Sequence, residues 1–246
     1  MTWWDIVFAQ HMFRDGLRWK LKYSQQSVDK LRFVRSIDAY HCKVKFFDDL
    51  ALQKYGQLVV YKHVINLDCS VHDLYTTCLS DKYPDVFDLH SFEENYQIIQ
   101  AENSTDAIFD DSLHLHSAVF GQNVDLKIPF GLVREGFYCS TNVFVPELKT
   151  YYRITKPVPR EFVLGKGLRA MVPDKSKQQM IGFNWMAFEQ VATDKCRFIH
   201  VFANNLGGYL GSTGNWLSKT MGTTINKRQA KTFAKRVDSA LGWYID

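Results

Sequence analysis

The sequence lacks the features that mark repeat, membrane-spanning and secreted proteins. It contains no internal repeat, no low-complexity tract and no linker rich in Pro, Gly or Ser, which favours a single continuous domain over residues 1–246. No uncharged stretch approaches the roughly 18 to 20 apolar residues that a membrane span requires. The first residues show no basic segment followed by an apolar one, so we expect no secretory signal.

Cysteine is scarce and has no paired spacing. The five cysteines are odd in number, widely spread and never form CxxC; they are Cys42, Cys69, Cys78, Cys139 and Cys196. This usage is typical of reduced, packed thiols and predicts a cytoplasmic protein.

An excess of charge of one sign is also missing. The chain has 30 Lys and Arg against 26 Asp and Glu, a net charge of +4. That is too weak to indicate a nucleic-acid partner, although it would suit an anionic membrane surface. Aromatic residues, in contrast, reach 15%. Aromatic side chains often line binding cavities, but a large ordinary core explains them equally well.

Hydrophobic periodicity predicts an α+β protein. Helical spacing is found at 3–15, 70–79 and 226–241, with Asn226 as the expected cap of the last helix. Runs of strands flanked by helices favour an antiparallel sheet, across which the long amphipathic last helix must lie. The predicted strands are 18–23, 42–46, 58–67, 96–100, 113–120, 137–145, 151–154, 168–172, 180–191 and 197–203.

Motifs of catalysis are missing as well. We find no nucleophile elbow, phosphate loop, HExxH or paired-cysteine metal site, so we expect no enzyme, no catalytic residue, no metal and no cofactor. His114 and His116 lie two apart on a predicted strand and could share a metal, but no third ligand is evident. We expect them to be polar groups inside a cavity, or a pair facing solvent.

The predicted strand 137–145 has an unusually polar face. Tyr138, Ser140, Asn142 and Phe144 share one side of it. Such a row is costly in a dry core unless it is hydrogen-bonded. It suits a cavity that holds the polar head of a ligand, and it suits a face that meets water equally well.

Two segments could touch a membrane. The loop 121–133 carries Ile128, Phe130 and Leu132 between two predicted strands, which is typical of a lid tip or a membrane-touching loop, although loop apolar residues are also often folded under. The last helix carries a basic stripe that could meet anionic headgroups or simply be solvated. We take Lys227, Lys231 and Lys235 as its membrane-facing residues.

Four segments stand out in order along the chain: 60–67 with 70–75, 133–137, 166–170, and 198–210 with 215–219. Together they resemble the signatures of START domains, a family of lipid-binding proteins. The last of them resembles the family's closing pattern, in which a strand runs into a double glycine and then into a tryptophan-containing helix. The similarity covers residues 55–242 closely and the first 54 residues more loosely.

Departures from the family pattern bear on the ligand. In sterol- and ceramide-binding members an acid faces the cavity, and its position here is His114; the arginine that pairs with it in sterol binders falls at Ser140. The ion pair of the sterol type is therefore missing. The ending 202–208 is similar to that of phosphatidylcholine transfer proteins, which use aromatic faces to hold choline. Tyr138, Tyr152 and Trp185 are our candidates for such a cage.

The resemblance implies a helix-grip fold, in which a curved antiparallel sheet surrounds a long C-terminal helix and encloses a hydrophobic tunnel. It also implies non-enzymatic binding and transfer of a lipid, with a phospholipid favoured, gated by loop 121–133 and the last helix. We expect a monomer that contacts membranes transiently. The predicted ligand-binding residues are His114, His116, Tyr138, Ser140, Asn142, Tyr152, Arg169 and Trp185. The alternatives are a sensor of sterol, ceramide or another hydrophobic ligand, and a helix-grip enzyme using His114 with Glu135 or Asp125 as acid and base.

Overall fold

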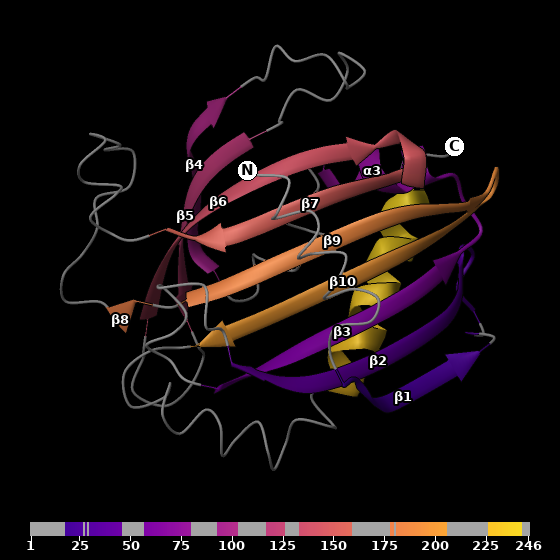
Figure 1. Cartoon of the computed structure of the whole chain (residues 1–246), viewed down its shortest axis with the longest axis horizontal. Helices are drawn as coiled ribbons and strands as arrows, with labels where there is room; N and C mark the ends of the chain where they lie inside the picture. The colour runs from indigo at the N-terminus through magenta and orange to yellow at the C-terminus, as the bar shows by residue number, and fades with distance from the viewer. Residues whose placement is uncertain are drawn as a thin grey trace.

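A computed structural model describes residues 18–26, 28, 30–45, 57–79, 93–102, 117–125, 133–158, 178–179, 181–205 and 226–242. Most of these residues belong to one sheet, which is strongly curved (Figure 1). Its strands are β1 (Lys20–Gln26), β2 (Val34–Lys45), β3 (Gln57–Leu67), β4 (Glu93–Glu102), β5 (Ser117–Asp125), β6 (Val133–Val145), β7 (Thr150–Pro157), β8 (Gln178–Gln179), β9 (Ile181–Ala192) and β10 (Lys195–Asn205).

The strand order brings distant parts of the chain together. It runs β1-β2-β3-β10-β9-β7-β6-β5-β4, with all neighbours on this path antiparallel and the short β8 paired in parallel with β6. The last two long strands therefore insert between β3 and β7.

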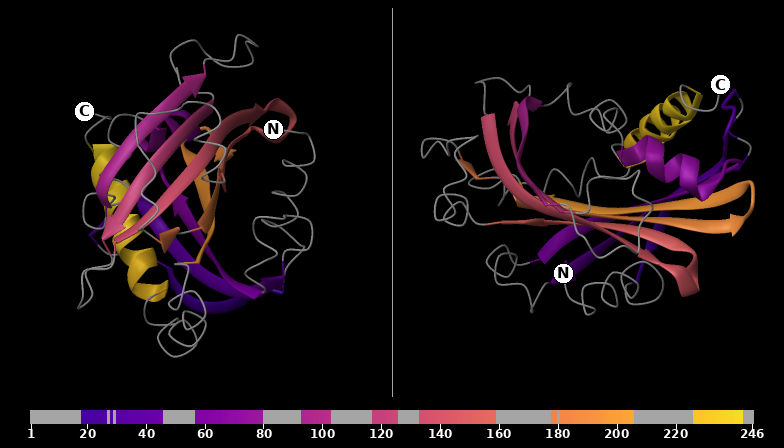
Figure 2. Two further views of the ribbon diagram at one scale, coloured as in Figure 1. Left: turned by 90° about the vertical axis from the view of Figure 1, so that its left-hand side faces the viewer. Right: turned by 90° about the horizontal axis from the view of Figure 1, so that it is seen from above.

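Two helices lie on the same side of the sheet, the side toward which it curves (Figure 2). We call this side the concave face. The first helix is α3 (Val71–Leu79), preceded by Ser70, whose hydroxyl accepts a hydrogen bond from the Asp73 amide at 3.1 Å and donates to its carboxylate at 2.6 Å. That arrangement resembles a capping box, which stabilises a helix start. The second helix spans 226–242 and crosses β10, β3 and β2.

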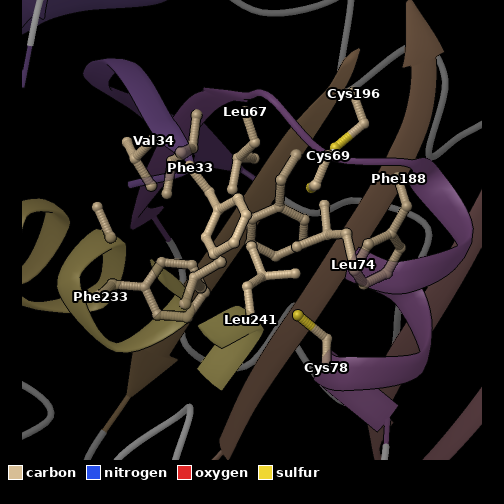
Figure 3. Packing of buried hydrophobic residues seen from close by; sticks show 14 of the residues in the cluster. Phe33, Val34, Leu67, Cys69, Leu74, Cys78, Phe188, Cys196, Phe233 and Leu241 are labelled. Atoms are coloured by element: carbon tan, nitrogen blue, oxygen red, sulfur yellow. Dashed lines mark hydrogen bonds between the residues drawn. The ribbon is translucent and has the colours of Figure 1, made fainter. Parts of the chain in front are cut away.

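The apolar face of helix 226–242 packs on the sheet. Figure 3 shows Phe233 and Leu241 reaching toward β3, β10 and α3. Phe198 on β10 joins the layers, because its ring centroid lies 4.9 Å from that of Phe188 and 5.5 Å from that of Phe233. The cluster contains Phe33, Val34, Ile37, Ala39, Ile65, Leu67, Cys69, Val71, Leu74, Tyr75, Cys78, Met186, Phe188, Cys196, Phe198, Ala230, Phe233, Ala234, Val237, Ala240 and Leu241.

The opposite, convex face carries a second apolar cluster. It contains Cys42, Val60, Val145, Tyr152, Ile154, Phe183, Trp185, Ala187, Ile199, Val201 and Ala203. Both faces of the central strands are therefore hydrophobic, and four of the five cysteines are buried as free thiols. Burial raises the pKa of the Cys42 thiol to about 12.

The expected α+β architecture is confirmed, and most strand positions agree with the predictions. The predicted loop 121–133 was too long. Gly121–Asp125 continues β5 in register with β6, from Gly121 opposite Phe137 to Asp125 opposite Val133. Glycine and asparagine weakened the strand signal there, but cross-strand hydrogen bonds to β6 supply what local propensity lacks. The predicted helix 3–15 and strand 168–172 lie outside the described residues.

In the part of the chain that the structure describes, no helix has the length and apolar character needed to cross a membrane.

Candidate functional site

The polar row predicted on strand 137–145 lies on the concave face of β6. Ser140 and Asn142 are opposite Thr155 and Arg153 of β7, which in turn are opposite Asn184 and Met186 of β9. Directly paired residues of antiparallel strands share a face. Because Met186 belongs to the helix-facing cluster, the whole row faces the helix side.

This row is buried although it is polar. Tyr138, Ser140 and Asn142 are 5%, 3% and 6% exposed. The Thr155 hydroxyl donates to Ser140 Oγ at 3.1 Å. This burial excludes the alternative of a strand face that meets water. Buried hydroxyl and amide groups need hydrogen-bond partners. A ligand with a polar head would find donors and acceptors on this part of the concave face.

Gly136 allows the first member of the row to fold along its strand. A Cβ atom at position 136 would lie 2.6 Å from the Tyr138 ring and its hydroxyl oxygen. Glycine is therefore required for this placement of Tyr138.

Arg153 is a half-buried cation in the same row, and sequence reasoning missed it. Burial raises the pKa of Tyr75 on α3, while the nearby Arg153 charge opposes that shift. The guanidinium therefore lies near the helix side of the sheet. Arg153 alternates with Tyr152 along β7, and this alternation was the available sequence signal. It separates the two faces of the strand but does not show which of them is concave, because β7 is buried on both faces.

Tyr152 and Trp185 lie apart from the polar row. Both belong to the convex cluster, 1% and 3% exposed, on the opposite face of the sheet from Ser140. The structure does not bring them together with Tyr138. We leave them out of the proposed site for this reason.

A second polar group lies where helix 226–242 begins. His63 on β3 and His200 on β10 are directly opposite in register, with ring centroids 6.1 Å apart. His63 Nε2 lies 2.7 Å from Asn226 Oδ1, and His200 Nε2 lies 2.8 Å from Asn184 Oδ1. Asn226 Nδ2 donates to the Tyr40 carbonyl at 3.2 Å. Asn226, expected as a helix cap, thus directs its side chain to the sheet.

Burial sets the charge of both histidines. It lowers the pKa of His63 to about 4, against the opposing hydrogen bond from Asn226. It also lowers the pKa of His200 well below its ordinary value, with the neighbouring His63 adding to the shift. Both rings are therefore neutral at pH 7. Sequence reasoning missed them because each is a lone histidine in an otherwise apolar strand.

The basic stripe is exposed as predicted. Lys227, Lys231 and Lys235 are all exposed on helix 226–242. Lys227 and Lys231 place their ammonium groups 5.1 and 5.3 Å from the Tyr23 ring centroid, a cation–π distance. Lys227 and Lys231 thus lie beside Tyr23 of the edge strand β1.

The remaining predicted site residues lie outside the described part of the chain. They are His114, His116, Ile128, Phe130, Leu132 and Arg169. Among the residues that the structure does describe, no group of three His, Cys, Asp or Glu side chains could hold a metal ion.

Comparison with known proteins gives structural matches only. No family model matches the sequence, and no curated protein matches it. The structure of human STARD10 aligns with a TM-score of 0.65 and 12% identity over 99% of this chain and 81% of its own. Human StAR-related lipid transfer protein 5 aligns at 0.61 and 12%, over 98% and 94% of the two chains.

A third solved structure agrees with these two. The human StarD13 (DLC2) lipid transfer and protein localization domain aligns at 0.55 and 10% identity, over 98% of both chains. At this level of identity the likeness concerns the fold. Together with the curved antiparallel sheet and the helix laid across it, these matches show that the chain has the helix-grip fold of START domains.

Proposed function

We propose that this chain binds one lipid between the concave face of the sheet and helix 226–242, and carries it between membranes without chemical change. The observation that carries the proposal is the buried polar row of Tyr138, Ser140 and Asn142, on the same face of the sheet as the apolar cluster that packs on the helix. The likeness to solved lipid-transfer proteins supports it. A monomer in the cytoplasm, meeting membranes only transiently, completes the proposal.

The physical basis is that the acyl chains and the polar head of a lipid need different surroundings. Acyl chains gain about 0.8 kcal/mol for each methylene that leaves water, and an apolar tunnel supplies that environment. A polar head would meet Ser140, Asn142 and Thr155, of which Ser140 and Thr155 already share a hydrogen bond. We propose a phospholipid, because Ser140 stands where sterol binders of the family place an arginine and the nearby cation is Arg153 on β7.

His114, His116 and Arg169 stay proposals for further polar contacts. Loop residues Ile128, Phe130 and Leu132 stay proposals for the membrane-touching tip.

The lysines of helix 226–242 give a first prediction. A Lys near an anionic surface contributes about 1 kcal/mol. We expect K231Q and K235Q each to weaken binding to phosphatidylserine-containing vesicles about fivefold at low salt, with the difference shrinking as salt screens the charges. Vesicle co-sedimentation measures this. K195Q is the matched control, because Lys195 is exposed at the first residue of β10. Equal losses in all three variants would contradict a membrane role for this helix.

The loop tip gives a second prediction. Replacing Phe130 with Asp is expected to slow phospholipid transfer between vesicles about tenfold, because a buried carboxylate at the bilayer surface is strongly disfavoured. The thermal unfolding midpoint should not change. A fluorescent phospholipid moving from donor to acceptor vesicles reports the rate. Transfer at the wild-type rate would remove this loop from the mechanism.

A further inference from the structure

The two ends of helix 226–242 are held to the sheet by different chemistry. At the far end, the Asp238 carboxylate accepts backbone hydrogen bonds from Arg32, Phe33 and Val34 at 3.0, 2.6 and 3.0 Å. At the near end, the polar contacts of Asn226 are to the His63 ring and the Tyr40 carbonyl. One end therefore depends on a carboxylate and the other on a neutral imidazole.

The contact to His63 requires one particular tautomer. Asn226 Nδ2 donates to the Tyr40 carbonyl, which fixes the amide so that Oδ1 faces His63. An amide oxygen only accepts, so His63 Nε2 carries the hydrogen. The other ring nitrogen, Nδ1, is then a bare acceptor. It is buried and has no hydrogen-bond partner among the described residues.

A second proton must therefore enter His63 at Nδ1, where no described residue accepts a hydrogen bond from it. The ring is 1% exposed and is directly opposite His200, which is 8% exposed. His200 Nε2 is likewise within hydrogen-bond distance of Asn184 Oδ1, at 2.8 Å. Charging either ring in place would put a cation in an apolar layer formed by Phe202, Phe233 and Phe198.

On the described strands and helix packed around the pair, no carboxylate shares its face near it. On the described strands β2, β3, β9 and β10, the titratable side chains that share the concave face near the pair are His41, Lys43 and Tyr61. The helix contributes the cations Lys227 and Lys231, and β7 contributes Arg153. The Asp238 carboxylate lies about three turns further along the helix and is bonded to residues 32–34.

We infer that His63 and His200 form an acid-sensitive catch for the first turn of helix 226–242: protonation of the pair releases that turn from the sheet, while Asp238 keeps the other end in place. The first turns of the helix then unwind from the sheet, while the turns around residue 238 stay docked. The consequence for a bound lipid, release at an acidic surface, rests on the proposed function; the opening itself does not.

The direction of the effect follows from linkage. Consider a histidine whose pKa is lower in the closed state than in the open state. It stabilises the closed state at pH values above its open-state pKa, near 6.5, and it loses that contribution as the pH falls. For His63 the window runs from about 6.5 down to about 4. Between pH 6 and pH 5 the opening constant should rise about sevenfold from His63 alone. It should rise further because burial also lowers the pKa of His200.

Amide hydrogen exchange of the full chain, corrected for intrinsic rates, tests the inference without any lipid. In wild type, the amides of 230–233, the first with intrahelical partners, should open more than sevenfold more at pH 5 than at pH 6, with those of 237–242 unchanged. H200Q should retain about sevenfold, H63Q a smaller rise than wild type, and H63Q/H200Q none. Glutamine keeps an N–H donor and does not titrate. H72Q, at the exposed His72 of α3, is the matched control and should behave as wild type.

Three results would overturn the catch. One is a wild-type opening constant that does not change between pH 6 and pH 5, and another is equal acceleration at both ends of the helix. The third needs no variant: nitrogen NMR of the wild-type rings at pH 7 should show His63 protonated at Nε2, and a proton at Nδ1 would contradict it. If the chain binds no lipid but still opens as the pH falls, the proposed function alone would be contradicted.

Discussion

Replacing Phe198 with Ala is expected to lower the free energy of unfolding by about 3 to 5 kcal/mol, the range for an aromatic side chain removed from a packed core. Phe198 is fully buried and contacts Phe188 on the sheet and Phe233 on the helix. Its loss therefore leaves a cavity at the junction of both layers. Urea unfolding measures the change, and the slope with denaturant should stay the same.

Val191 on β9 provides the matched control. It lies on the same sheet but is 56% exposed, so V191A should change the free energy of unfolding by no more than about 0.5 kcal/mol. A loss below about 1 kcal/mol in F198A would contradict the close packing of helix 226–242 on the sheet.

Replacing Asp238 with Ala is expected to cost about 3 kcal/mol, because three backbone donors lose a charged acceptor. Asp238→Asn should cost about 1 kcal/mol, since an amide keeps the one oxygen that accepts from Phe33 and Val34 and loses the bond from Arg32. Urea unfolding gives the free energies, and amide exchange at residues 32–34 reports the site itself. The graded order of Ala below Asn below wild type is the specific expectation; equal stability of all three would show that the carboxylate does not fasten the helix.

The sequence pattern predicted the two faces of a strand where polar and apolar residues clearly alternate. Strand 137–145 alternates polar and apolar residues, so its two faces could be told apart and the polar row was found. On β7 the same rule fails: Tyr151 and Tyr152 point to opposite faces, one toward each apolar cluster, and two neighbouring tyrosines give no contrast. The alternation along β7 therefore could not show that Tyr152, a candidate together with Tyr138, lies on the other face of the sheet.

Contacts between distant segments had no signal in the sequence. Asp238 and residues 32–34 are about 200 positions apart, and nothing in either segment indicates the other. His63 and His200 meet only because β10 inserts beside β3. Each histidine alone is consistent with a buried core residue, and their pairing with Asn226 follows from the topology.

The resemblance of four short segments predicted more than periodicity could. It gave the curved sheet with the long helix across it, which the structure confirms. It did not place the polar groups at the start of that helix, because the catch residues His63, His200 and Asn226 depend on which side chains meet across three elements.

Native mass spectrometry of the purified chain, followed by extraction and identification of any bound lipid, tests the central claim most directly. The account predicts one phospholipid per chain, lost or exchanged when the protein is incubated with vesicles of another phospholipid. A chain that carries no lipid and takes up neither phospholipid, sterol nor ceramide from vesicles would contradict lipid transfer, and a ligand returned with a changed mass would point to an enzyme.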